Sequence, residues 1–241
     1  MIKRRFFLVS ASALTLSACG GNLLGPPDAG PIYMVAPKFS AAATGGDKVR
    51  WALTILRPDM AAGLDTDRIA LTQADGTMDY YAKATYPDRL PNIIQHALLD
   101  GFEASGRIDR VAREEDALHA DYNLDVEVKD FAAHYSQPDG IPGVTVTIMV
   151  KLTTAHGRDI VGSFSTTQTG TDSVNSAGAT AQTLQQALAA AVTQIVDWAL
   201  KAPFPVTQQA TSTASPGKPA EELLHDATRG TSRVGEKPAP Q

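Results

Sequence analysis

The stretch DYNLDVEVKD, residues 121–130, alternates strictly between polar and apolar side chains. Its apolar positions are Tyr122, Leu124, Val126 and Val128. Successive side chains of a β-strand point to opposite faces of the sheet. The alternation therefore predicts a strand with one buried face and one face in water.

The segment that follows repeats this pattern. VTVTIMVKL, residues 144–152, is apolar at every second position, and the intervening SQPDGIPG, residues 136–143, is typical of a turn. A third strand is predicted at about 159–167, after the tight turn His156-Gly157-Arg158. Three strands connected in this way form an antiparallel meander with one buried face.

Two segments are predicted to form amphipathic helices, at residues 88–105 and at about 177–200. In the first, apolar or small residues recur with helical spacing at Leu90, Ile93, Ile94, Ala97, Leu98, Gly101 and Phe102. The second repeats the spacing at Leu184, Leu188, Ala191, Ile195, Trp198 and Ala199. Shorter strands are predicted at 49–57, 67–72, 78–82 and 107–112. Together these elements predict an α+β domain, in which a mainly antiparallel sheet carries two amphipathic helices packed on one face.

The N-terminus has the pattern of a secretory signal. Three basic residues, 3–5, precede a largely apolar run at 6–16, which is too short to span a bilayer as a helix. Leu16-Ser17-Ala18-Cys19 then resembles a bacterial lipobox, so residues 1–18 are interpreted as a lipoprotein signal peptide. Cys19, the only cysteine, is predicted to become the N-terminus and to carry two or three acyl chains such as palmitate. An ordinary signal peptide that happens to precede a cysteine is the alternative.

The lipid anchor places the protein in the cell envelope, facing the periplasm. Gly20 stands where Asp would favour retention in the inner membrane, so the outer membrane is expected. Residues 19–31 are interpreted as a lipidated tether with a reach of about 20 Å. Residues 32–202 form one domain, and the proline-rich residues 203–241 are predicted to be disordered.

Charge excludes one class of partner. Without Lys3, Arg4 and Arg5, the chain has 18 basic and 26 acidic residues, a net charge of −8. Nonspecific binding to nucleic acid requires clustered Lys and Arg, so no nucleic-acid partner is expected.

No catalytic constellation and no metal site emerges from the motifs. The histidines, His96, His119, His134, His156 and His225, lack metal-ligand spacing. His96 and Asp100 are interpreted as a surface hydrogen bond rather than half of a site. The run at 113–116 lacks the pattern of a calcium loop and is interpreted as a solvated turn. No catalytic residue, no metal and no cofactor other than the lipid on Cys19 is therefore predicted.

Two groups of side chains leave a functional alternative open. Asp121, Asp125 and Glu127 share one face of a strand and could serve as a hydrolytic carboxylate pair, although a polar outer face is the simpler interpretation. Tyr80, Tyr81 and Tyr86 cluster before the first helix, with Trp51 upstream. They could line a groove for a lipid or a partner, but packing is the commoner role for aromatic residues near a sheet edge.

The chain resembles the family of ABC-type transport auxiliary lipoproteins, also called PqiC-like, over roughly residues 1–200. The residues that carry the resemblance are Ile32–Pro37, Leu64–Ile69, Tyr80-Tyr81, Asp88–Pro91 with Gln95, Ala97 and Leu98, then Ala120–Tyr122 with Leu124 and Phe131, and finally Val196–Trp198. Tyr86 stands where the family pattern has Trp, and residues after 203 lie outside the resemblance.

The resemblance implies a non-catalytic role in lipid transport. Similar proteins are lipoprotein subunits of mammalian-cell-entry (MCE) systems, in which an ABC permease, its ATPase and an MCE-domain protein move phospholipids or other hydrophobic molecules between the two membranes. It implies docking onto the MCE-domain protein, with Tyr80, Tyr81 and Tyr86 as contact candidates, and assembly into a homo-oligomeric ring. A lipid-anchored periplasmic hydrolase and a solute-binding lipoprotein are the alternative functions.

Overall fold

The computed structural model describes residues 30–39, 46–116 and 118–201. The predicted signal peptide, Cys19, the tether up to residue 29 and the predicted tail 203–241 lie outside the described residues. The helices and strands of the described residues fall within the predicted domain 32–202, whose boundaries stay predictions. In the described ranges no helix combines the length and apolar character needed to cross a membrane.

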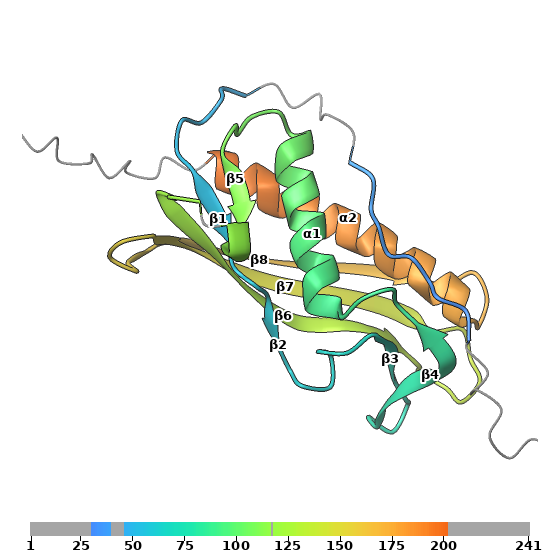
Figure 1. The fold of residues 1–241 in the computed structure, drawn as a ribbon. Coiled ribbons are helices and arrows are strands. Elements are labelled where there is room, and N and C mark those ends of the chain that lie inside the picture. The colour runs from blue at the N-terminus through green and yellow to red at the C-terminus, as the bar shows by residue number, and fades with distance from the viewer. Residues whose placement is uncertain (1–29, 40–45, 117, 202–241) are drawn as a thin grey trace, which may run out of the picture. The chain divides into compact units, whose positions relative to one another are not determined.

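The predicted meander forms the body of the sheet (Figure 1). β6 (Tyr122–His134) pairs antiparallel with β7 (Gly143–Thr154), which pairs antiparallel with β8 (Ile160–Thr171). The even-numbered residues of β6 from Tyr122 to Val128 are buried, and so are those of β7 from Val144 to Leu152. The alternation therefore places one face of these two strands in the core, as the sequence predicts.

A β-bulge extends β6 beyond the alternating stretch. Val128 lies opposite Ile148 and Asp130 lies opposite Thr147, so Lys129 is the extra residue. One additional residue shifts the side-chain phase by one position. Phe131, an odd-numbered residue, consequently faces the core and is fully buried.

The other edge of β6 carries three short strands in succession. β1 (Leu53–Ile55), β2 (Asp59–Met60) and β3 (Arg68–Thr72) each pair with it in parallel. β4 (Met78–Thr85) pairs antiparallel with β3, and β5 (Val111–Arg113) pairs parallel with β1. The longest pairings are antiparallel as predicted, whereas this flank of the sheet is mixed.

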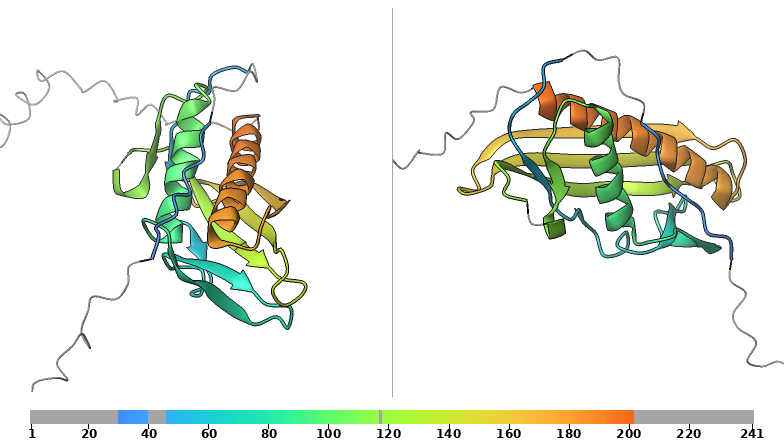
Figure 2. Two further views of the ribbon diagram at one scale, coloured as in Figure 1. Left: turned by 90° about the vertical axis from the view of Figure 1, so that its right-hand side faces the viewer. Right: turned by 45° about the horizontal axis from the view of Figure 1, so that its top comes forward.

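Both predicted helices lie on one face of the sheet, side by side (Figure 2). α1 (Leu90–Ala104) begins with Pro91 in its first turn, where the missing N–H leaves no hydrogen bond unmade. α2 (Ala177–Lys201) is the longer helix and lies over β7 and β8. A short 3-10 helix, η1 (Glu114–Asp116), follows β5.

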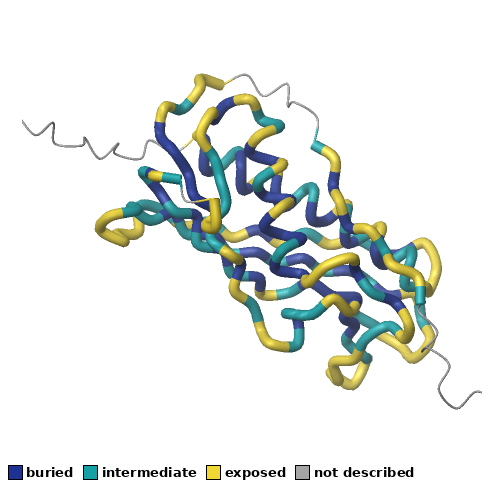
Figure 3. Tube along the Cα trace, viewed as in Figure 1, coloured by how far each residue is buried: buried dark blue, intermediate teal, exposed yellow. Residues whose placement is uncertain are grey.

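A glycine of α1 lies close against α2. A Cβ atom on Gly101 of α1 would lie 2.4 Å from Cγ1 of Val192 on α2. The hydrophobic core lies between this helix layer and the sheet, and Figure 3 shows the buried segments of both layers facing each other. The apolar stripes that predict the helices thus mark the faces that meet the sheet.

The first described segment, residues 30–39, runs along the helices. The Tyr33 N–H donates to the Thr85 carbonyl at 2.8 Å, and the Ala36 N–H donates to Oε1 of Gln185 at 3.1 Å. A Cβ on Gly178 would lie 3.1 Å from the Tyr33 ring. These contacts hold the start of the domain against β4 and the N-terminal half of α2 (Figure 1).

Candidate interaction site

Tyr80 and Tyr81 are neighbours on β4, so their side chains point to opposite faces of the strand. The Tyr80 hydroxyl donates to the Gly63 carbonyl at 2.8 Å, and the Arg68 guanidinium lies 4.0 Å from the centre of the Tyr80 ring. A cation over an aromatic face is attracted to the ring electrons. Tyr80 therefore links β4 to the loop between β2 and β3 while staying partly exposed.

Tyr81 joins β4 to the start of α2 through hydroxyl groups. Its oxygen lies 2.9 Å from the Tyr135 hydroxyl and 2.8 Å from the Thr180 hydroxyl. Thr180 donates to Oδ2 of Asp172 at 2.5 Å, and Tyr135 donates to Oδ1 of Asn175 at 2.6 Å. Burial raises the pKa of Tyr81 well above its usual range, so this hydroxyl stays protonated.

Tyr86 lies in the core. Its side chain is 3 % exposed, and its ring packs edge-on against Phe131 with the centroids 6.5 Å apart. Burial raises the pKa of Tyr86, whose hydroxyl oxygen has no hydrogen-bond partner among the residues that the structure describes. The three tyrosines do not form one surface group. Their role as partner contacts stays a prediction, with Tyr80 and Tyr81 as the accessible members.

Two of the three carboxylates that could have formed a hydrolytic pair, Asp121 and Glu127, are engaged in structural contacts. Asp121 Oδ2 accepts the Ala52 N–H at 2.7 Å and lies 3.7 Å from Arg110. Glu127 forms an ion pair with Lys129, and the hydrogen bond from that ammonium holds the pKa of Glu127 below its usual range. Asp125 lies opposite Lys151 of β7. These residues belong to the polar outer face of the sheet, which is the simpler of the two interpretations.

His96 is paired across two elements. Its Nε2 lies 2.9 Å from Nη1 of Arg113 on β5, and Arg113 also forms ion pairs with Glu115 and Asp116. The run at 113–116 thus folds onto its own arginine as a short 3-10 turn. Within the described ranges, no group of three His, Cys, Asp or Glu side chains could hold a metal ion.

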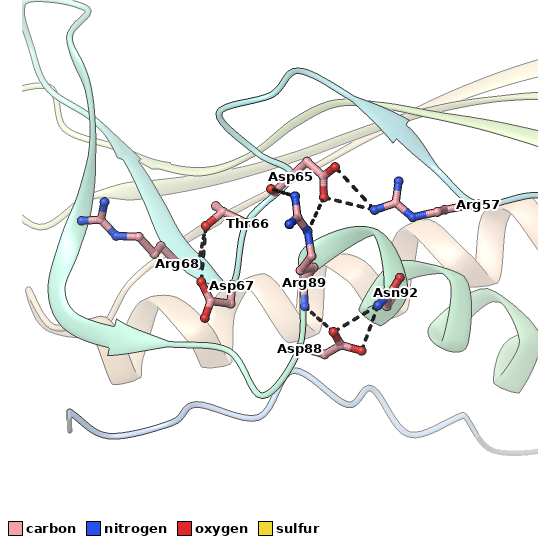
Figure 4. A network of polar contacts seen from close by, with 8 residues as sticks. All are labelled: Arg57, Asp65, Thr66, Asp67, Arg68, Asp88, Arg89 and Asn92. Atoms are coloured by element: carbon pink, nitrogen blue, oxygen red, sulfur yellow. Dashed lines mark hydrogen bonds and ion pairs between the residues drawn. The ribbon is translucent and has the colours of Figure 1, made fainter.

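A network of charged residues fastens the start of α1 to the loop between β2 and β3 (Figure 4). The Arg89 guanidinium donates to Oδ1 of Asp65 at 3.0 Å and to the Asp65 carbonyl at 2.6 Å. Arg57 donates to the same carboxylate at 3.2 Å. The hydrogen bond from Arg89 holds the pKa of Asp65 below its usual value. Asp88 accepts the Arg89 N–H at 2.7 Å and both of its oxygens accept from the Asn92 amide.

This network borders a polar hollow of about 360 Å³, lined by Asp65, Thr66, Asp67, Pro87, Asp88 and Arg89. The two sequence segments that carry the family resemblance here, 64–69 and 88–91, are therefore brought together in space. The carboxylates of Asp65 and Asp88, which both contact Arg89, each accept at least one hydrogen bond within 3.1 Å. The geometry assigns these residues to positioning α1.

A cleft of about 320 Å³ lies between α1 and α2, and the sequence pattern did not reveal it. It is lined by Lys38, Phe39, Gly101, Ala104, Ser105, Arg107, Ala189, Ala190, Thr193, Val196 and Asp197. Arg107, 8 % exposed, donates to the Leu200 carbonyl at 3.0 Å and lies 3.8 Å from Asp197. The lining comes from three segments far apart in the chain, 38–39, 101–107 and 189–197, so no local motif marks it.

Comparison with protein families decides the identity. The family model of the ABC-type transport auxiliary lipoprotein component matches residues 33–196, from the segment beside β4 to the last turns of α2. This chain belongs to the ABC-type transport auxiliary lipoprotein family. Membership makes the protein an envelope-associated lipoprotein with an auxiliary role in ABC-type transport.

Two solved structures are similar to this chain over most of their own length. Protein XCC0632 from Xanthomonas campestris is 26 % identical, with a TM-score of 0.65 over 70 % of this chain and 94 % of that one. An uncharacterized protein at 12 % identity has a TM-score of 0.51 over 70 % of this chain and 99 % of that one. The second similarity concerns the fold alone. Comparison with curated proteins gives no match.

Proposed function

We propose that this auxiliary lipoprotein is the lipid-anchored, non-catalytic subunit of an MCE-type ABC system that moves phospholipids or other hydrophobic molecules between the inner and outer membranes. The observation that carries the proposal is the family match over residues 33–196 directly downstream of a lipobox-like Leu16–Cys19. Transport of this kind supports the integrity of the envelope.

The anchor is the lipid on Cys19, in the periplasmic leaflet of the outer membrane. Ten residues, 20–29, separate Cys19 from the first described residue, and a flexible chain of that length spans about 17 Å. Residues 31–33 are hydrogen-bonded to Thr85 of β4. The anchor therefore keeps the β4 end of the domain close to the membrane. Two or more acyl chains make such attachment lasting.

The partners are the MCE-domain protein and, through it, the ABC permease and ATPase. The contact lies at Tyr80 and Tyr81, which are partly exposed and belong to the membrane-proximal end. Tyr86 supports that end from the core by packing on Phe131. Several copies of the lipoprotein form a homo-oligomeric ring around the path of the transported lipid.

Labelling with a palmitate analogue tests the anchor, because a Cys19→Ala variant should lose the label and leave the membrane fraction. A photo-crosslinking amino acid at Tyr80 tests the contact. Asp109 is the control position, since its side chain is 69 % exposed and lies in the loop between α1 and β5. The proposal predicts an MCE-domain protein in the Tyr80 adduct and not in the Asp109 adduct. Equal adducts at both positions would contradict the proposed contact.

A further inference from the structure

One end of the domain exposes large apolar side chains on two neighbouring loops. Ile141 lies in the turn between β6 and β7 and is 54 % exposed, and Val174 lies between β8 and α2 and is 55 % exposed. The Asp172 N–H donates to the Pro142 carbonyl at 3.2 Å, so the two loops are in contact. Exposed apolar groups that gather in this way mark a surface for a protein or a membrane.

The chain enters the domain at this same end. Gly30 lies against Lys83 of β4, and the Tyr33 ring lies against Gly178 in the first turn of α2. Ile32, between these two contacts, is also exposed. Figures 1 and 2 show residue 30, the turn between β6 and β7 and the connection from β8 to α2 at one end of the domain, with the turn between β7 and β8 at the other. We call the first of these, with Ile32, Ile141 and Val174, the apolar end.

Charge is scarce at the apolar end. Residues 30–36 carry none, residues 135–143 carry only Asp139, and residues 171–178 carry only Asp172, which is buried. The turn between β7 and β8, by contrast, exposes Arg158 and Asp159. The chain outside its signal peptide is acidic, and the negative potential of a phospholipid surface repels acidic groups. The apolar end is therefore a part of the domain that such a surface can accept.

Hydrogen bonds hold the apolar loops in place. The Tyr135 hydroxyl donates to Oδ1 of Asn175, next to Val174, and the Thr180 hydroxyl donates to Oδ2 of Asp172. The Tyr81 hydroxyl lies within hydrogen-bond distance of both of these hydroxyl groups. A surface that is already ordered loses little conformational freedom when it binds.

We propose that the apolar end inserts Ile141 and Val174 into the phospholipid leaflet that holds the lipid on Cys19, so that the domain stands on the membrane by this end. The inference rests on the lipid anchor of the proposed function and goes beyond it, because a tether alone leaves the orientation of the domain free. The stretch from Cys19 to Gly30 spans at most about 36 Å when fully extended, which keeps the apolar end within reach of the leaflet. Apolar side chains gain free energy by shallow insertion at the boundary of headgroups and acyl chains. Copies assembled in a ring would all stand on the leaflet by the same end.

Single thiol labels can measure this insertion. Cys19 is the only cysteine and its sulfur carries the lipid, so one cysteine substitution gives the lipidated chain one free thiol. Ile141→Cys and Val174→Cys are the test variants. Ile160→Cys is the matched control, because Ile160 is also apolar, is 62 % exposed and begins β8 at the other end of the domain. The two ends of β8, Ile160 and Thr171, lie about 35 Å apart.

The full-length lipidated variants are purified from membranes, labelled with a fluorophore and reconstituted into vesicles of phosphatidylethanolamine and phosphatidylglycerol that contain no other protein. A quencher attached to the acyl chains near the headgroups should quench the labels at 141 and 174 several-fold more than the label at 160. Ile141→Asp should reduce the quenching of the label at 174 several-fold, whereas Ile160→Asp should leave it unchanged.

Flotation of the vesicles tests the anchor separately. A chain that does not float with them lacks the anchor, which would overturn both the proposed anchor and the inference. Flotation with labels at 141 and 174 that are quenched no more than the label at 160 would overturn the inference alone and would leave the apolar end to a protein partner. Because the vesicles contain no transport partner, neither result depends on the proposed role in MCE-type transport.

Discussion

Replacing Gly101 with alanine is expected to destabilise the protein even though alanine favours helices. The new Cβ would lie 2.4 Å from Cγ1 of Val192, more than 1 Å inside the separation of about 3.5–4.0 Å at which carbon atoms attract. Val192 is fully buried, and a valine in a helix has one strongly preferred rotamer, so it cannot turn aside freely. The helices must move apart.

The magnitude follows from two opposing effects. Overpacking a buried contact costs about 1–3 kcal/mol. The exchange of glycine for alanine inside a helix returns about 1 kcal/mol. The net loss should therefore be about 0–2 kcal/mol for Gly101→Ala. In a Val192→Ala background the clashing methyl is absent, so the same change should be neutral or stabilise the protein by up to about 1 kcal/mol.

Urea unfolding of the four proteins in this double-mutant cycle measures the coupling. Fluorescence of Trp51, which is buried with its ring 5.5 Å from that of Tyr122, reports the transition. A coupling of about 1–3 kcal/mol is expected between Gly101→Ala and Val192→Ala, because only the overpacking cost differs between the two backgrounds. If Gly101→Ala has the same effect in both backgrounds within about 0.5 kcal/mol, the close helix contact is refuted.

Three further changes test the polar contacts by urea unfolding. Asp65→Asn should cost about 0.5–1 kcal/mol at pH 7, since the pair with Arg89 is partly exposed. The pKa of Asp65 is lowered in the folded protein. Its contribution to stability is therefore complete above the unfolded pKa near 3.8 and is lost as the pH falls through the folded pKa. A difference in unfolding free energy between the two proteins that does not change with pH would contradict this. Asp121→Ala should cost about 1–2 kcal/mol, because it leaves the Ala52 N–H unpaired. Asp125→Ala should change stability by less than about 0.5 kcal/mol. Equal effects of the two changes would refute the structural role of Asp121. Tyr81→Phe should cost about 1–2 kcal/mol by removing the hydroxyl between Tyr135 and Thr180, and an unchanged midpoint would show that this bridge contributes nothing.

The regular periods of the chain predicted the body of the fold. Alternation from Tyr122 to Val128 and from Val144 to Leu152 marked the buried face of the sheet, and the 3.6-residue stripes marked both helices. These elements are long, and each buries one face against a common core, so pattern and structure coincide. The bulge at Lys129 was missed because one inserted residue has no signature of its own.

The mixed flank of the sheet was not predictable in detail. Of the predicted strand at 49–57 only Leu53–Ile55 forms β1. The two-residue β2 lies beyond that range and was not predicted; Pro58, which has no N–H to donate, precedes it. Two- and three-residue strands depend on the neighbour that they pair with, here β6, and that neighbour is distant in sequence. The cleft at Arg107 likewise follows from assembly of the whole domain.

Recovery of transport partners tests the central claim most directly. The tagged, lipidated protein would be purified from membranes, with a Cys19→Ala variant as the matched control, and the accompanying proteins identified by mass spectrometry. The account predicts that an MCE-domain protein, an ABC permease and its ATPase accompany the lipidated chain and are depleted with the variant. Recovery of the chain without any of them, with tag and anchor intact, would contradict its role in MCE-type transport.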